Sequence, residues 1–186
     1  MGKLSAFNFI TLNGFFKGTN EDISWNKHGK EEEEFSAENL KSGDVLLFGR
    51  VTYEMMEKYW TSPIAMETSP IVAGGMNRAE KIVFSRTLKT AHWNNTKLIN
   101  ENIIEEIKKI KKNPAKDLTI LGSGSILTLF TEHGLIDEYQ VMIYPTAIGQ
   151  GTPLLNGIKH NLELKLIKTR TFKSGTVLLS YQPVTK

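Results

Sequence analysis

The sequence predicts an α/β fold in which a mostly parallel sheet is flanked by helices and ends in antiparallel edge strands. Two observations support this prediction. Strand-like and helix-like segments alternate along most of the chain, as they do in folds built on a parallel sheet. The last two segments are both strand-like and are joined by Lys173-Ser174-Gly175, which is typical of an antiparallel pair.

The predicted strands are of two kinds. A continuous apolar run bounded by turn residues indicates a strand buried on both faces at residues 45–48. Residues 81–84 indicate another short strand, and residues 118–121 another buried one. Alternating segments at 4–12 and 138–144 indicate two more strands. Leu98-Ile99 indicates a further short one, and the C-terminal pair is expected at 162–168 and 176–182.

Helices are expected between these strands. Isoleucines at spacings of three and four predict a helix over 102–112, which Pro114 ends. The other predicted helices are residues 31–42, a segment from Thr52 to about Trp60, and a segment through 126–130 that ends at His133-Gly134. Residues 61–79 contain two prolines and Gly74-Gly75 and are expected to be irregular, as is the loop from Asn13 to about residue 30.

Composition narrows the class of protein. The chain has 186 residues, of which 40% are hydrophobic, and it shows no repeat or linker, so we predict one domain over residues 1–186. A net charge of +3 does not point to nucleic acid, and the absence of cysteine excludes disulfides and thiolate sites. No signal peptide or membrane span is recognisable, so we expect a cytoplasmic protein. The four histidines, His28, His92, His133 and His160, have no metal-ligand spacing, and no metal is expected.

The loop Gly122-Ser123-Gly124-Ser125 lies between a predicted strand and a predicted helix. Its glycines let a ligand approach the backbone, and the helix N-terminus attracts anions, so a pyrophosphate would fit. A tight turn in which serine caps the helix explains the same residues equally well. The loop is not a Rossmann fingerprint, because Leu127 stands where the third glycine is needed.

Two further segments follow predicted strands. Gly49, Arg50 and Thr52 combine a close turn, a guanidinium fork suited to phosphate, and a hydroxyl that can cap a helix or donate to a phosphate. Ser85 and Arg86 could hold a ribose phosphate. Each segment alone is also explained as a solvated loop. Ligands of open α/β sheets bind beyond the carboxyl ends of the strands, so the three loops together predict a site for a pyrophosphate and an additional phosphate.

The sequence resembles a known superfamily at these same positions. The relevant segments are LLFGRVTYE at 46–54, LTILGSGSILTLFTEHGLIDEYQVMIYPTAIGQGTPLL at 118–155 and FITLNGFFKG at 9–18. They resemble the dihydrofolate reductase-like superfamily, and most closely the branch of the RibD C-terminal (riboflavin-biosynthesis reductase) domain, over about residues 4–182. The resemblance implies a three-layer αβα fold with a mostly parallel mixed sheet.

The resemblance also implies NADPH as cofactor and, for many members of the branch, a homodimer. It assigns an adenosine-phosphate turn to Gly49, Arg50 and Thr52, a second 2′-phosphate contact to Ser85 and Arg86, and a pyrophosphate loop to Gly122, Ser123, Gly124, Ser125 and Ile126. It places the nicotinamide near Phe9, Asn13, Gly14 and Phe16. The chain departs from the branch at Asn13, where aspartate is common, and at Ser123, where glycine is common. No catalytic acid is assigned among Glu31–Glu34.

Three functions are compatible with these residues. The first is an NADPH-dependent reductase that transfers a hydride to a small heterocyclic substrate of the pterin or ribosylaminopyrimidine type. The second is a non-catalytic NADP(H)-binding or regulatory module on the same fold, since a fold does not fix a function. The third is an interaction protein whose edge strands mediate dimerisation. The sequence contains no deaminase domain, so we expect a free-standing paralogue of the bifunctional riboflavin enzyme with a different substrate.

Overall fold

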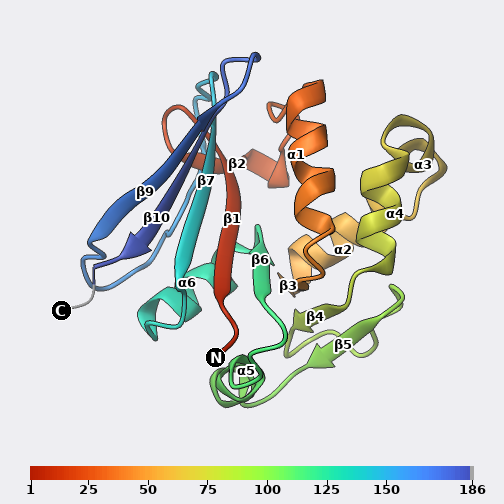
Figure 1. Cartoon of the computed structure of the whole chain (residues 1–186), viewed down its shortest axis with the longest axis vertical. Coiled ribbons are helices and arrows are strands. Elements are labelled where there is room, and N and C mark those ends of the chain that lie inside the picture. Colours follow the sequence, from red (N-terminus) through yellow and green to blue (C-terminus); the bar gives the residue numbers. More distant parts are fainter. Residues whose placement is uncertain (185–186) are drawn as a thin grey trace.

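The computed structural model describes residues 1–184, and an eight-stranded sheet runs through it in the order β5-β4-β3-β6-β1-β7-β10-β9 (Figure 1). Six strands are parallel: β1 (Leu4–Thr11), β3 (Val45–Gly49), β4 (Lys81–Phe84), β5 (Thr96–Ile99), β6 (Leu118–Leu121) and β7 (Glu138–Tyr144). Two are antiparallel and form one edge: β9 (Leu164–Thr171) and β10 (Val177–Pro183). This arrangement confirms the fold class that the sequence predicts.

Helices cover both faces of the sheet and complete the three layers (Figure 1). The helices α5 (Ile103–Lys111) and α6 (Gly124–Glu132) bury Ile107 and Phe130 against Leu47 of β3. On the other face, α2 (Arg50–Trp60) and α4 (Pro70–Arg78) bury Tyr53 and Met76. Also on that side are α1 (Lys30–Leu40), which packs beside α4, and the short helices η1 (Thr19–Glu21) and α3 (Pro63–Thr68). This layering is the three-layer αβα arrangement that the resemblance implies.

The prediction that residues 61–79 are irregular is wrong, because α3 and α4 occupy most of this segment. Pro63 and Pro70 each lie in the first turn of a helix, where the N–H group that proline lacks has no intrahelical partner. Gly75 brings α4 close to α1, since a β-carbon there would lie 2.9 Å from Cδ1 of Leu40. The prolines therefore begin these two helices, and the glycine allows α4 to pack.

Two other boundaries differ from the prediction. The helix expected from Thr52 begins at Arg50, with Gly49 as its N-cap, so Thr52 does not cap it. The loop expected between Asn13 and residue 30 contains a strand, β2 (Phe15–Gly18), which pairs with β8 (Gly151–Pro153). This two-stranded sheet joins segments that are far apart in the chain and fixes residues 15–18 beside the end of β1.

The order of the strands creates a switch point between β3 and β6. From β3 the chain passes through α2, on one face, to β4 and the edge at β5. From β6 it passes through α6, on the other face, to β7 on the far side of β1. The two helices therefore diverge from neighbouring strand ends, which is where open α/β sheets bind their ligands.

Among residues 1–184, none of the helices combines the length and the apolar character needed to cross a membrane. The same residues contain no group of three His, Cys, Asp or Glu side chains that could hold a metal ion.

Candidate functional site

Hydrogen bonds join the two predicted phosphate loops at the switch point. The N–H of Gly49 donates to Oγ of Ser123 at 2.7 Å, and the N–H of Ser123 donates to Oγ1 of Thr52 at 3.1 Å. Gly122 completes the contact with a φ of +57°, and a β-carbon there would lie 3.2 Å from Cγ2 of Thr52. Ser123 and Thr52 thus brace one loop against the other.

Both helices that start here lack a side-chain cap. The N-cap residues are Gly49 for α2 and Ser123 for α6, and neither makes a side-chain capping bond. The first N–H groups of a helix have no intrahelical partner, and the helix dipole places partial positive charge on them. Two such N-termini side by side suit a ligand with two linked phosphates. Ser125 is exposed in the first turn of α6, whereas the side chain of Ile126 is buried and leaves only its N–H for a ligand.

A cleft of about 1020 Å³ opens from this point. Its walls include Thr52, Gly122 and Ser123 at the phosphate end. From there it extends over the sheet between α1 and α2, past Phe9 and Trp25. Ligand pockets of drug-sized molecules span about 300–1,000 Å³, so the cleft is large enough for part of a dinucleotide together with a second small molecule.

A smaller hollow of about 600 Å³ lies on the other side of the start of α2, and Arg50, Lys89 and His92 line it. Arg50 forms an exposed ion pair with Glu54 at 2.9 Å, and Lys89 supplies a second cation. Ser85, which the resemblance assigns to a phosphate, is buried, and its Oγ accepts from the N–H groups of Thr87 and Leu88. Its hydroxyl therefore holds the turn that presents Lys89.

Arg86, the other residue assigned to this phosphate contact, is exposed on the same turn but is not among the residues lining the hollow. The basic lining of the hollow therefore comes from Arg50 and Lys89. The sequence reasoning named only the first of these two.

The residues expected near the nicotinamide separate into two groups. Phe9 and Phe16 line the cleft, and the ring of Phe16 covers the start of α6, since a β-carbon on Gly124 would lie 2.8 Å from its Cζ. Asn13 and Gly14 do not line the cleft. The amide of Asn13 donates to the carbonyl of Ile148 at 2.8 Å and accepts from its N–H at 3.3 Å, so it ties the 11–14 turn to a distant loop.

A polar group at the aromatic end of the cleft was missed by sequence reasoning. His28 lines the cleft, packs against the ring of Phe9, and its Nδ1 is 3.0 Å from the hydroxyl of Tyr144. Desolvation lowers the pKa of His28, and the nearby carboxylates of Glu32 and Glu33 oppose that shift. Burial raises the pKa of Tyr144, and the charge of Glu32 adds to the effect. His28 is therefore neutral at pH 7 and adjacent to a protonated phenol.

Glu32 is buried behind this pair. Its carboxylate accepts from the N–H of Gly29 at 3.1 Å and from the hydroxyl of Ser174, so it holds the N-cap residue at the start of α1. The carboxylate of Glu31 is not simply solvated either, because it accepts from the N–H of Lys173 at 2.9 Å. The glutamate run thus anchors α1 to the β9–β10 turn.

The sequence model of the RibD C-terminal domain matches residues 3–178. The chain belongs to the RibD C-terminal domain family. It is 34% identical over 172 residues to the uncharacterized protein YyaP of Bacillus subtilis (strain 168), a match that covers 92% of this chain and 90% of YyaP.

Solved structures of similar fold bear reductase names. One is a diaminohydroxyphosphoribosylaminopyrimidine deaminase/5-amino-6-(5-phosphoribosylamino)uracil reductase of Thermotoga maritima, with a TM-score of 0.72 at 12% identity, covering 98% of this chain and 57% of that one. Another is a pyrimidine reductase-like protein of Corynebacterium diphtheriae, with a TM-score of 0.64 at 12% identity, covering 100% of this chain and 93% of that one. At these identities the likeness shows the shared fold.

The family relationship explains why the three loops were recognisable and why other parts of the site were not. Gly49, Arg50 and Gly122 stand in the short motifs that carry the resemblance to this family. His28, Trp25 and Lys89 lie in loops without such a motif, and only the fold brings the first two into the cleft. Arg86 and Lys89 were the one signal in the sequence that this turn is basic.

Proposed function

We propose that this protein is an NADPH-dependent reductase that transfers a hydride to a small heterocyclic substrate of the pterin or ribosylaminopyrimidine type. One observation carries the proposal. Two uncapped helix N-termini, at Gly49 and Ser123, are bridged by hydrogen bonds at the switch point and face a cleft of about 1020 Å³. Membership in the RibD C-terminal family supports a reductase-type role.

The residues present fit the cofactor in three respects. The first N–H groups of α2 and α6 would hold the pyrophosphate, with the exposed hydroxyl of Ser125 as a further donor. Arg50 and Lys89 in the adjoining hollow would hold a 2′-phosphate, which distinguishes NADPH from NADH. Phe9 and Phe16 give the remaining wall an apolar surface on which a flat ring can lie.

A reduced nicotinamide supplies the hydride when it is bound, and the protein contributes position, electrostatics and exclusion of water. Reduction of a C=N or C=C bond also consumes a proton. His28 is the one histidine that lines the cleft within residues 1–184, and imidazole exchanges protons near neutral pH. We therefore propose that His28, oriented by the hydroxyl of Tyr144 on its Nδ1, takes up a proton from solvent and passes it to the substrate, which returns the imidazole to its neutral form.

The test is NADPH oxidation, followed by absorbance, with a panel of pterins, pyrimidines and carbonyl compounds. The proposal expects turnover with at least one planar heterocycle and less turnover with NADH. Tight NADPH binding without turnover on any compound would instead support the non-catalytic module. The homodimer that the resemblance implies stays a prediction, to be checked by light scattering.

A further inference from the structure

We infer that the substrate half of the cleft accepts a planar aromatic heterocycle that is neutral or cationic and carries no phosphate. This inference rests on the proposed function, because it concerns the molecule that would lie beside the nicotinamide. It separates the substrate from the phosphoribosyl compound in the name of the Thermotoga reductase. Three independent features of the cleft support it, namely its charge, its apolar walls and its unpaired polar atoms.

The charge on the walls disfavours a phosphate. Within residues 1–184, five carboxylates line the cleft: Glu21, Glu33 and Glu38 come from η1 and α1, and Asp44 and Asp117 lie at the amino ends of β3 and β6. The lysines and arginines that line it number two, Lys3 and Lys17. A phosphate in protein sites is normally met by arginine, lysine or helix N-termini, and in this cleft the helix N-termini are at the far, dinucleotide end.

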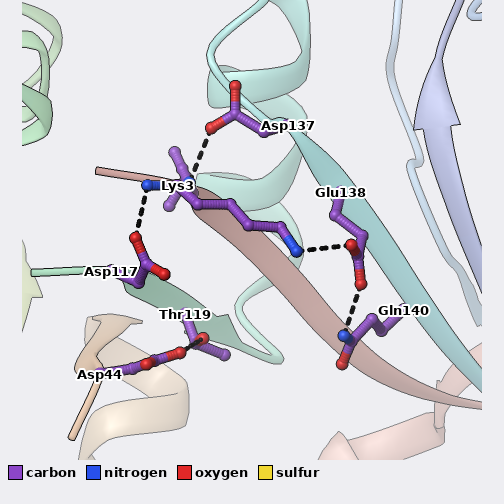
Figure 2. A network of polar contacts seen from close by, with 8 residues as sticks. Lys3, Asp44, Asp117, Thr119, Asp137, Glu138 and Gln140 are labelled. Carbon is purple, nitrogen blue, oxygen red and sulfur yellow. Dashed lines mark hydrogen bonds and ion pairs between the residues drawn. The ribbon is translucent and has the colours of Figure 1, made fainter. Parts of the chain in front are cut away.

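Both lysines are already paired with carboxylates. Lys17 is 2.5 Å from Glu21. Nζ of Lys3 is 2.6 Å from the carboxylate of Glu138, which also accepts from the amide of Gln140 (Figure 2). The backbone N–H of Lys3 donates to the carboxylate of Asp117. A dianionic phosphate in the cleft would have to break one of these pairs and would still face an excess of negative charge.

The walls that face each other beyond the phosphate end are apolar. Val51, Met55 and Tyr59 lie four residues apart on α2 and therefore form one stripe along the cleft. Val51 and Tyr59 are each 45% exposed, so a large part of the stripe is open to a ligand. Phe16 and Trp25 line the cleft from the segment that precedes α1. Flat aromatic molecules stack on such surfaces.

Unpaired polar atoms in the cleft lining match the edge of a heterocycle. Nε1 of Trp25, Oδ1 of Asn26 and Oδ1 of Asn8 are buried and have no hydrogen-bond partner within residues 1–184. All three residues line the cleft, and Trp25 and Asn8 are only 8% and 3% exposed. One donor and two acceptors are left without a partner, and a buried polar group without a partner destabilises the fold. These atoms have almost no accessible surface of their own, so a ring with N–H and C=O groups would satisfy them once the side chains of Trp25, Asn26 and Asn8 turn toward the cleft.

The experiment compares riboflavin with riboflavin 5′-phosphate, which have the same ring and differ by one phosphate, and adds proflavine as a planar cation. Binding of each probe is followed by the probe's own fluorescence, which is quenched when its ring stacks on tryptophan or tyrosine. Titrations are run with and without saturating NADP+. We expect riboflavin or proflavine to bind in the micromolar range, and riboflavin 5′-phosphate at least tenfold more weakly when NADP+ is present.

A variant pair tests the cause of this preference. Glu21→Gln releases Lys17, so the affinity for riboflavin 5′-phosphate should rise about fivefold while that for riboflavin stays the same. Glu34→Gln removes a carboxylate that pairs with Lys30 outside the cleft and should change neither. The inference is overturned if the phosphorylated probe binds as tightly as riboflavin, if neither the neutral nor the cationic probe binds below 1 mM, or if NADP+ displaces the bound ring. If NADP+ itself does not bind, the proposed function is refuted. The order of the probe affinities measured without NADP+ then still tests this inference.

Discussion

Replacing Ser123 with alanine would separate the structural role of the glycine-serine loop from its binding role. The hydroxyl of Ser123 is buried and accepts the N–H of Gly49 at 2.7 Å. The substitution leaves that N–H unpaired, which costs about 1–3 kcal/mol for a buried group. In a chain of this length each kcal/mol lowers Tm by about 2–4 °C, so Tm should fall by about 2–12 °C.

Ser125→Ala is the matched control, since Ser125 is exposed on the same loop. Its stability should stay within about 0.5 kcal/mol of the parent, as for most surface substitutions. Its affinity for NADPH should fall about fivefold, because one hydrogen bond of about 1 kcal/mol is lost.

Urea unfolding and NADPH titration of both variants check this pair of expectations. The reasoning is refuted if Ser123→Ala is as stable as the parent, or if Ser125→Ala is the destabilised variant.

Three further predictions use other parts of the site. Arg50→Gln should weaken NADPH about tenfold or more and leave NADH unchanged, because a charged hydrogen bond is worth about 1.5–3 kcal/mol; equal losses for both dinucleotides would remove Arg50 from the 2′-phosphate. Gly122→Ala should destabilise more than Gly134→Ala, because both have positive φ but only position 122 meets another side chain, Thr52 at 3.2 Å; equal unfolding midpoints would contradict this. The pKa of His28, measured by NMR titration, should lie below 6.5. The unfolded chain then binds this proton more readily than the folded chain, so the free energy of unfolding should fall as the pH drops below 6.5. His28→Gln should lack this pH dependence, and a pKa above 6.5 would contradict the prediction.

The core strands could be predicted because their sequences leave few alternatives. Val45–Phe48 is a continuous apolar run between turn residues, and the structure buries all of it at the centre of the sheet. Leu118–Leu121, apolar except for Thr119, lies beside it and buries Leu118 and Ile120. Helix α5 could be predicted from its isoleucine spacing. These signals are local, so the rest of the chain is not needed to interpret them.

The missed elements depend on distant contacts. Strands β2 and β8 have four and three residues, and each exists only because it pairs with the other across more than 130 positions. Helices α3 and α4 begin with proline and α4 contains two glycines, which in isolation disfavour a helix. The packing of Gly75 against Leu40 of α1 stabilises α4, which the local sequence alone does not favour.

In the site, the sequence indicated which residues gather but not where their side chains point. Ser123, Ser85 and Asn13 have the polar groups that a ligand would need, yet the structure uses all three to hold the backbone of neighbouring loops. His28 and Trp25 reach the cleft from a segment without a recognisable motif. Side-chain direction follows from tertiary contacts, which spacing along the chain does not encode.

Titration with NADPH and NADH tests most directly whether the paired helix N-termini at Gly49 and Ser123 bind a dinucleotide. Trp25, Trp60 and Trp93 provide the fluorescence signal, and Trp25 and Trp60 line the cleft itself. We predict that NADPH binds with a dissociation constant well below the millimolar range and that NADH binds more weakly. The proposed cofactor site would be contradicted if neither dinucleotide bound below the millimolar range.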